Sequence, residues 1–155
     1  MDKIIVVDFS GTLIRPEIAE EANRKRYTLL GIPAQSKEQE KIVHATKKHY
    51  DLLKEVIGKR CGLEDSMEIK YVQNYGKEIT LSGKDIKTII MTDLFRDMMY
   101  EVATERGQQI FTEGMIAALQ EIKKRGYSLA IASGIRKDII TGLLAITKCP
   151  VTFDY

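Results

Sequence analysis

The apolar positions at the start of the chain form a continuous run instead of a helical stripe. Residues 4–7 are Ile-Ile-Val-Val, and the run ends in a carboxylate, Asp8. An unbroken run of β-branched residues predicts a strand that is buried on both faces of a parallel sheet. Asp8 would then lie at the carboxyl end of the strand, which is where open α/β sheets bind their ligands.

From Pro16 onward the apolar positions recur at helical spacing. Pro16 suits the first position of a helix and Gly31 its end, so the pattern predicts a helix between them. A second, long helix is predicted from a capping box at Ser36 and Gln39 as far as Gly58. The inward-facing residues expected on these two helices are Ile18, Ala22 and Leu29, then Ile42, Thr46, Tyr50, Leu53 and Ile57.

The middle of the chain carries two further patterns. Residues 67–81 alternate apolar and polar positions around Asn74-Tyr75-Gly76, which predicts a β-hairpin. Ser82 and Asp85 are spaced to cap a third helix that ends at Gly107. The inward-facing residues expected on this helix are Ile86, Ile90, Leu94, Met98 and Val102.

The last part of the chain alternates helix and strand. We expect a helix over 114–125, a strand over 128–132, a helix over 138–147 and a short strand over 151–154. This alternation is typical of an α/β fold with a parallel sheet and right-handed crossovers.

Composition excludes several classes of protein. The chain has 155 residues, of which 44% are hydrophobic and 30% charged, as in ordinary soluble domains. A net charge of +2 gives no strong attraction to nucleic acid or to a membrane, so we expect neither as a partner. The apolar run at the amino terminus is short and ends in an acidic residue, Asp8, so a signal peptide is not expected. No apolar stretch approaches the ~20 residues of a spanning helix.

The cysteines and histidines form no metal-binding or redox pattern. Cys61 and Cys149 are far apart, which favours two reduced thiols in a cytoplasmic protein. His44 and His49 share no helix face, so we expect solvated or half-buried side chains and not metal ligands.

The residues after Asp8 carry the candidate chemistry. Ser10-Gly11-Thr12 offers hydroxyls, a permissive glycine and backbone N–H groups in a tight turn. A carboxylate beside such a turn suits covalent catalysis on an anionic substrate. The alternative is that Asp8 only caps a strand-to-helix turn.

Two segments resemble motifs of the haloacid dehalogenase (HAD) superfamily. Asp8-Phe9-Ser10-Gly11-Thr12-Leu13 resembles the first motif, Asp-x-Asp-Gly-Thr-Leu, with Ser10 in place of the second Asp. Leu129-Ala130-Ile131-Ala132-Ser133-Gly134 resembles the second motif, and Phe111-Thr112-Glu113-Gly114 the segment that leads into it. The resemblance covers the two ends of the chain and not its middle.

The resemblance implies a three-layer, Rossmann-like core. Residues 1–14 and 109–155 would form that core, and residues 15–108 a mostly helical cap domain inserted after the first strand. The implied activity is that of a Mg²⁺-dependent phosphatase, which acts on a small phosphorylated metabolite through an aspartyl-phosphate intermediate.

The resemblance also assigns roles to residues. Asp8 would be the nucleophile and a Mg²⁺ ligand, and Ser10 would bind the ion through its backbone carbonyl while occupying the position of a catalytic residue. The expected substrate-binding residues are Phe9, Thr12, Ser133 and Gly134. For the last two, the alternative is that they only cap the following helix.

Two departures from the family pattern leave the activity open. A serine at position 10 cannot transfer protons near neutral pH as the family's second Asp does. A slow phosphatase, a dehalogenase- or phosphonatase-type hydrolase and a non-catalytic binding or assembly module all remain compatible with Ser10. The third and fourth motifs have no counterpart before Tyr155, so we expect a chain truncated after the second motif.

Other polar residues near the end of the chain are weaker candidates. Asp154 matches the strand after the second motif and not a metal ligand, and we expect Arg136 and Lys137 to be solvated residues at a helix start. With so few core strands, residues 3–8 would form an apolar, unpaired edge, which natural proteins avoid. We therefore expect another copy, a partner chain or the remainder of a longer protein to cover that edge.

Overall fold

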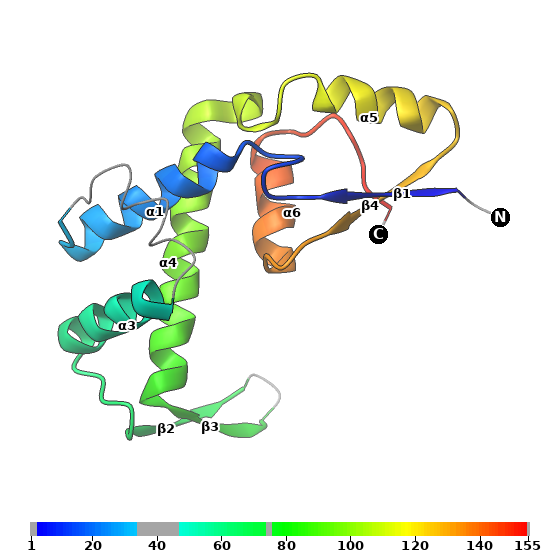
Figure 1. Ribbon diagram of the computed structural model, residues 1–155. Helices are drawn as coiled ribbons and strands as arrows, with labels where there is room; N and C mark the ends of the chain where they lie inside the picture. Colours follow the sequence, from blue (N-terminus) through cyan, green and yellow to red (C-terminus); the bar gives the residue numbers. More distant parts are fainter. Residues whose placement is uncertain (1–2, 34–46, 74–75, 155) are drawn as a thin grey trace. The chain divides into compact units, whose positions relative to one another are not determined.

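The computed structural model describes residues 3–33, 47–73 and 76–154 (Figure 1). Two compact units make up the chain. The first comprises residues 1–23 and 96–155, and the second comprises residues 24–95. Helices α1 (Pro16–Leu30) and α4 (Gly83–Arg106) each contribute to both units.

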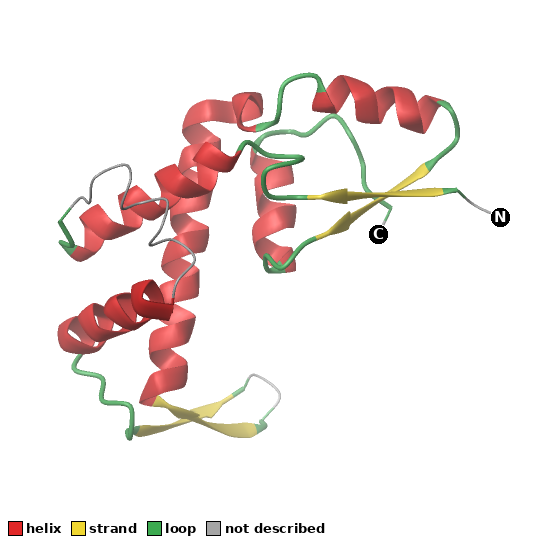
Figure 2. Ribbon diagram, viewed as in Figure 1, coloured by secondary structure: helices red, strands yellow, loops and turns green. Residues whose placement is uncertain are grey.

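The first unit contains a parallel pair of strands. Strand β1 (Ile4–Asp8) pairs with β4 (Ser128–Ala132), and the register places Ile4 beside Ser128 and Asp8 beside Ala132. The two arrows lie side by side and point the same way in Figure 2. The predicted α/β class with a parallel sheet is therefore confirmed.

The helices of the first unit follow the predicted order. After α4 come the 3₁₀ helix η1 (Gly107–Ile110), α5 (Met115–Lys124) and α6 (Lys137–Ile146). The predicted start of α1 at Pro16 is confirmed, and the helix ends just before Gly31, which has a φ of 66°. The fully buried large side chains of this unit are Phe9, Leu13, Ile14, Ile18, Met99, Ile110, Leu119, Leu129, Ile139 and Leu143.

The prediction that β1 is buried on both faces is wrong. Val7 is buried, but Ile4 and Val6 are 47% and 62% exposed. Side chains alternate between the two faces of a strand, so Ile4 and Val6 lie on one face and Val7 on the other. Among the residues that the structure describes, no element covers the face of Ile4 and Val6.

The predicted strand over 151–154 is also absent. This segment is held to β4 at one residue, where the N–H of Asp154 donates to the carbonyl of Leu129 at 2.8 Å. The N–H of Leu129 donates to the Asp154 side chain (Oδ2, 2.9 Å) and not to a backbone carbonyl. The Asp154 carboxylate accepts the hydrogen bond that a backbone carbonyl would accept in a regular sheet. Residues 151–154 therefore do not form a regular strand.

The second unit contains the predicted hairpin and two helical segments. Strands β2 (Glu68–Val72) and β3 (Glu78–Ser82) pair antiparallel, although Asn74 and Tyr75 at the turn lie outside the described residues. The capping box of α4 is confirmed, since the N–H of Asp85 donates to the Ser82 hydroxyl and the N–H of Ser82 to the Asp85 carboxylate, both at 3.1 Å.

Helix α3 spans Lys47–Cys61, so the predicted helix end at Gly58 is wrong. The predicted residues Ser36, Gln39, Ile42 and Thr46 lie outside the described residues. The helix continues past Gly58 to Cys61. A Cβ at Gly58 would lie 3.0 Å from the carbonyl oxygen of Leu63 and 3.1 Å from Cδ of Lys87. The glycine therefore permits a close approach of neighbouring chain and does not end the helix.

The predicted inward faces of α1 and α3 are confirmed at Ile18, Ala22, Leu53 and Ile57, which are buried, and wrong at two residues. Leu29 and Tyr50 are 52% and 44% exposed, while the adjacent Leu30 and His49 are buried. The apolar core of the second unit consists of Tyr27, Leu30, Leu53, Ile57 and Met91.

His49 corrects another prediction, because it is neither solvated nor half-buried. It lies in a buried polar cluster, in which Arg26 Nη2 is 3.3 Å from His49 Nε2 and the Tyr27 hydroxyl contacts the same ring. Arg26 Nη1 donates to the carbonyl of Met91 at 3.1 Å. Burial, together with the charge of Arg26, lowers the pKa of His49 to about 4.

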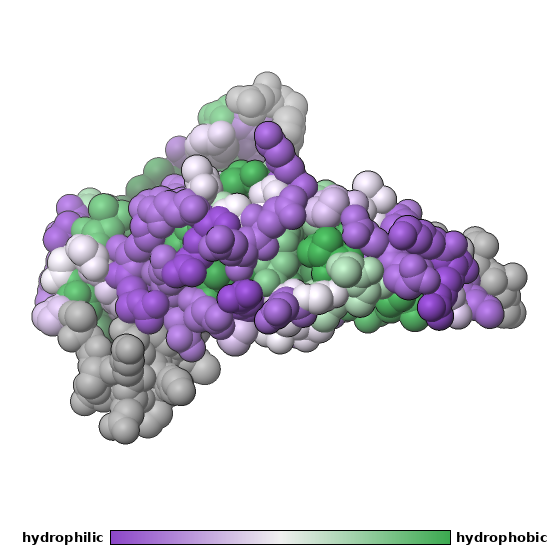
Figure 3. All heavy atoms as spheres, turned by 90° about the horizontal axis from the view of Figure 1, so that it is seen from above, coloured by the Kyte–Doolittle hydropathy of each residue, from purple (hydrophilic) through white to green (hydrophobic). Residues whose placement is uncertain are grey.

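The described residues include no candidate membrane-spanning helix. No helix among them is both long and apolar enough to cross a bilayer. On the face shown in Figure 3, hydrophobic areas are separated by hydrophilic ones.

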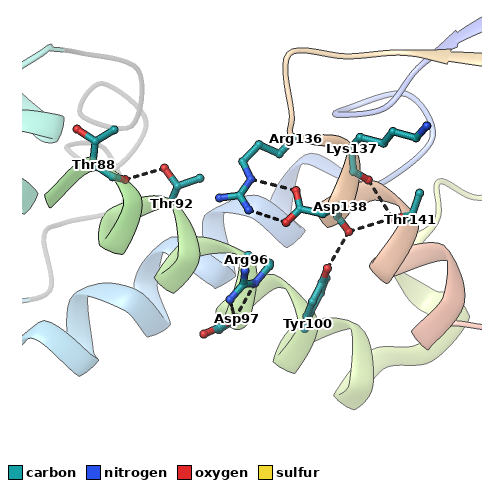
Figure 4. Close-up of polar contacts among 9 residues, drawn as sticks. All are labelled: Thr88, Thr92, Arg96, Asp97, Tyr100, Arg136, Lys137, Asp138 and Thr141. Carbon is teal, nitrogen blue, oxygen red and sulfur yellow. Dashed lines mark hydrogen bonds and ion pairs between the residues drawn. The ribbon is translucent and has the colours of Figure 1, made fainter. Parts of the chain in front are cut away.

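We predict that Gly142→Ala destabilises the first unit. A Cβ at Gly142 on α6 would overlap the hydroxyl and ring of Tyr100, whose hydroxyl donates to the carbonyl of Asp138 at 2.8 Å (Figure 4). Helix propensity alone would make alanine better by about 1 kcal/mol. Urea denaturation should instead show a net loss of about 1–3 kcal/mol from the overlap.

Two variants control this prediction. Gly134→Ala should be neutral for stability, because no heavy atom lies within 4 Å of a Cβ at that position. In a Tyr100→Leu background, Gly142→Ala should destabilise less than in the wild-type background. An equal loss in both backgrounds would show that Tyr100 is not the cause.

We predict that acid weakens the second unit through His49. The ordinary pKa of 6.5 falls to about 4 on folding, so the unfolded chain takes up a proton first as the pH falls. Stability should therefore decrease between pH 6.5 and 4, by about 2 kcal/mol at pH 5 relative to pH 7. Urea denaturation at the two pH values should show a smaller loss for His49→Gln, and equal losses would contradict the assignment.

Candidate functional site

The register of β1 and β4 brings the two sequence motifs to one end of the sheet. Asp8 and Ala132 are paired at the last positions of their strands, and Ser133 and Gly134 follow directly. Neighbouring strands lie about 4.8 Å apart, so both motifs leave the sheet side by side. Asp8, Ser133 and Gly134 are all exposed to solvent.

The carboxylate of Asp8 is bound by the next residue in the chain. The N–H of Phe9 donates to Asp8 Oδ1 at 2.8 Å, and the Phe9 side chain is completely buried. The backbone N–H of Phe9, one of the predicted substrate-binding residues, thus bonds to Asp8 in this structure. The buried ring fixes the chain where it leaves β1.

A tight turn follows Asp8 and holds its shape through backbone hydrogen bonds. The N–H of Ile14 donates to the carbonyl of Phe9, and the N–H of Gly11 donates to the carbonyl of Ile14, both at 2.9 Å. Gly11 has a φ of 77°, in the region that favours glycine. Leu13 and Ile14 are buried, so the turn is anchored in the core of the unit.

The same bonds orient the backbone of Ser10. Because Phe9 and Gly11 both bond to Ile14 in a parallel bridge, the N–H and carbonyl of Ser10 point away from Ile14. The side chain of Ser10 is exposed. The carbonyl oxygen of Ser10 thus does not bond to Ile14, and no described backbone N–H donates to it, so it is available to a ligand.

The available oxygen atoms suit a Mg²⁺ ion whose remaining coordination positions are filled by water and substrate. No group of three His, Cys, Asp or Glu that could hold a metal is found among the residues that the structure describes. Mg²⁺ usually keeps several waters and takes one or two carboxylates together with substrate phosphates. One carboxylate, Asp8, and one carbonyl, Ser10, are compatible with that coordination.

Ser133 and Gly134 form the turn that leads into α6. The N–H of Ile135 donates to the Ser133 hydroxyl oxygen at 3.1 Å, which leaves the hydroxyl proton available to another acceptor. The N-cap of α6 is Arg136, without a side-chain capping bond, so Ser133 does not cap this helix. The positive end of the α6 dipole faces this turn and favours an anion there.

Two further residues lie beside the turn after β1. Thr12, expected to bind substrate, is half-buried within the turn. Thr112 is not among the predicted site residues, and its backbone N–H donates to the carbonyl of Leu13 at 3.0 Å. Its buried hydroxyl has no hydrogen-bond partner among the described residues. The segment Phe111–Gly114 signalled this position, because it resembles the lead-in to the second motif.

The charged residues near the end of the chain have structural partners. Arg136 forms a two-point ion pair with Asp138, at 3.0 and 2.6 Å, which lowers the pKa of that carboxyl (Figure 4). Lys137 is exposed at the start of α6, as expected.

Asp154 lies away from Asp8. The N–H of Leu129 and the ammonium of Lys123 both donate to the Asp154 carboxylate and lower its pKa. Leu129 is near the amino end of β4, while Asp8 pairs with the last residue of that strand. The Asp154 carboxylate therefore links Lys123 of α5 to Leu129 of β4. The bond to Lys123 could not be predicted from sequence spacing.

Comparison with known proteins supports the fold. No protein-family model and no curated protein matches the chain. A solved structure, YfnB of Bacillus subtilis in an orthorhombic crystal form bound to magnesium, is similar with a TM-score of 0.56. That protein is provisionally assigned as a HAD-hydrolase.

The similarity is structural and distant. The two sequences are 13% identical, and the match covers 99% of this chain and 63% of YfnB. This chain thus spans less than two thirds of the length of that relative. The comparison shows that the fold of this chain is similar to that of YfnB.

Proposed function

We propose that this protein is a HAD-like hydrolase, specifically a Mg²⁺-dependent phosphatase for a small phosphorylated metabolite. The observation that carries the proposal is the meeting of Asp8 with Ser133 and Gly134 at the ends of two paired parallel strands. A nucleophile and anion-binding donors at one point are what phosphoryl transfer to a carboxylate needs.

Asp8 would act as the nucleophile. One carboxylate oxygen forms a bond to phosphorus while the bond from phosphorus to the ester oxygen breaks, and the departing oxygen takes a proton from water. The hydroxyl of Ser133 and the N–H of Gly134 donate to the non-bridging oxygens and stabilise their charge. Water then attacks phosphorus, releases phosphate and restores the carboxylate.

Asp8 and the carbonyl of Ser10 would hold a Mg²⁺ ion. When bound, the ion reduces the repulsion between the carboxylate and the anionic substrate. The side chain of Ser10 is not needed for this role. Replacing the family's Asp by Ser therefore affects proton transfer more than metal binding.

The lack of an acid at position 10 limits the range of substrates. General acid–base catalysis contributes about 10²–10⁴-fold, and its loss matters most for a poor leaving group such as an alkoxide. Ser10 is for this reason also compatible with cleavage of a carbon–halogen or phosphonate bond, or with a binding module that does not turn over. Generic phosphatase activity that depends on Asp8 distinguishes the first proposal from the module.

The cap and the partner chains belong to the same proposal. Residues 15–108 would form the cap that selects the substrate. The apolar edge of β1 would be covered by another copy of the chain or by a partner chain, because β1 pairs with β4 on one side and no described strand pairs with its other side. Neither nucleic acid nor a membrane is proposed as a partner.

We predict that phosphatase activity depends on Asp8 and responds to an acid at position 10. With p-nitrophenyl phosphate and Mg²⁺, Asp8→Asn should reduce the rate to background, and EDTA should do the same. Ser10→Asp should raise the rate on an alkyl phosphate by about 10²-fold or more, and less on p-nitrophenyl phosphate. Steady-state kinetics on the purified proteins measure both effects.

A surface variant controls for charge. Asp51→Asn removes an exposed carboxylate on α3 and should leave the rates unchanged. Equal rates for wild type and Asp8→Asn would refute catalysis by Asp8. In that case the non-catalytic binding module becomes the better account.

We predict that the exposed edge of β1 drives self-association. Size-exclusion chromatography with light scattering should show oligomers at high protein concentration. Val6→Lys places a charge on the exposed face of the strand and should shift the population toward monomer. A clean wild-type monomer at every concentration would count against coverage by another copy.

A further inference from the structure

The β-hairpin of the second unit leaves many of its apolar side chains exposed. Every residue of β2 is exposed, and the side chains of Ile69 and Tyr71 are 40% and 52% exposed. Among the residues that the structure describes, β2 and β3 pair only with each other (Figure 2). A two-stranded sheet is marginally stable in water unless further strands or a helix pack against it.

The outer edge of β2 presents backbone groups to a further strand. The N–H of Gly83 donates to the carbonyl of Met67 at 2.7 Å, so Met67 and the alternate residues after it bond to β3. The N–H and carbonyl groups of Glu68, Lys70 and Val72 consequently face the outer edge. The described residues form no backbone hydrogen bond to these groups.

The outer edge of β3 is less accessible to a further strand. Its outward residues are Glu78, Thr80 and Ser82, the register partners of the outward residues of β2. The N–H of Ser82 donates to the Asp85 carboxylate at 3.1 Å in the capping box of α4. A strand added beside β3 would have to displace this bond, whereas a strand added beside β2 would not.

The sequence of β2 is complementary to itself in one antiparallel register. With a two-fold axis at Ile69, Glu68 lies opposite Lys70 of a second copy, and Lys70 lies opposite the Glu68 of that copy. These residues face the outer edge and would form hydrogen-bonded pairs. An axis at Glu68 or at Lys70 would instead place like charges opposite each other, which destabilises a sheet.

The same register brings apolar side chains together. Ile69 and Tyr71 share one face of the hairpin with Leu81 and Ile79, their partners on β3. Across the axis, Ile69 would lie opposite the Ile69 of the second copy, and Met67 would lie opposite its Tyr71. Pairing of two hairpins would therefore give a four-stranded sheet with one continuous apolar face.

We propose that a second copy of this chain binds to the outer edge of β2. The two β2 strands pair antiparallel about a two-fold axis at Ile69, with Glu68 of each copy beside Lys70 of the other. The proposal is independent of the phosphatase function, since it uses neither Asp8 nor bound metal. It is also independent of association through β1, which belongs to the other unit.

The first test is disulfide cross-linking at the proposed axis. The background chain carries Val6→Lys, Cys61→Ser and Cys149→Ser, which remove association through β1 and the native thiols. In this background Ile69→Cys should form a covalent dimer on oxidation, because opposite Cα atoms would lie about 4.5 Å apart, within the range of a disulfide. Tyr71→Cys is the matched control and should cross-link at least tenfold more slowly, since its two copies would lie about 13 Å apart along the strands.

The second test exchanges charges between two variants of the background chain. Glu68→Lys and Lys70→Glu each place like charges across the axis, so each alone should self-associate about tenfold more weakly in sedimentation equilibrium. An equimolar mixture should regain the dimer, because the basic strand of one variant then faces the acidic strand of the other. Lys70 also pairs with Glu78 at 3.1 Å, but both side chains are largely exposed, so circular dichroism should show an intact fold.

Three results would overturn the proposal. The first is a background chain that stays monomeric at its highest soluble concentration. The second is equal cross-linking of Ile69→Cys and Tyr71→Cys, which would exclude the register centred on Ile69. The third is a mixture of the two charge variants that associates no better than either variant alone.

Discussion

The parallel pairing of β1 with β4 is the constraint on which the candidate site depends. Its register puts Asp8 beside Ala132, so that Ser133 emerges next to the carboxylate. A shift by one residue would turn Asp8 to the opposite face of the sheet. The buried side chains of Phe9 and Ile14 hold the turn after β1 in the core and so protect this arrangement.

Local signals in the sequence were enough to predict the elements that build the site. The apolar run before Asp8, the proline at the start of α1 and the capping box of α4 each act within a few residues, and the structure contains all three. The α/β class followed from the order of these elements. The conformation of Ser10, with its carbonyl directed away from Ile14, could not be predicted, because it depends on a bridge inside the turn.

The errors arose where distant parts of the chain decide the outcome. Exposure of Val6 depends on whether another element covers its face of the sheet, and nothing in its own segment encodes this. His49 is buried because Arg26 and Tyr27, on another helix, supply polar contacts for its ring. The segment over 151–154 fails as a strand because a side chain, Asp154, replaces a backbone acceptor.

We propose that Asp8, Ser133 and Gly134 together form one phosphoryl-binding site. A crystal structure of the protein grown with Mg²⁺ and beryllium fluoride, an analogue of the phosphoryl group, tests it most directly. Beryllium fluoride should be bonded to an Asp8 carboxylate oxygen and accept hydrogen bonds from the Ser133 hydroxyl and the Gly134 N–H. An analogue bound elsewhere, or an Asp8 that stays unmodified with both reagents present, would contradict it.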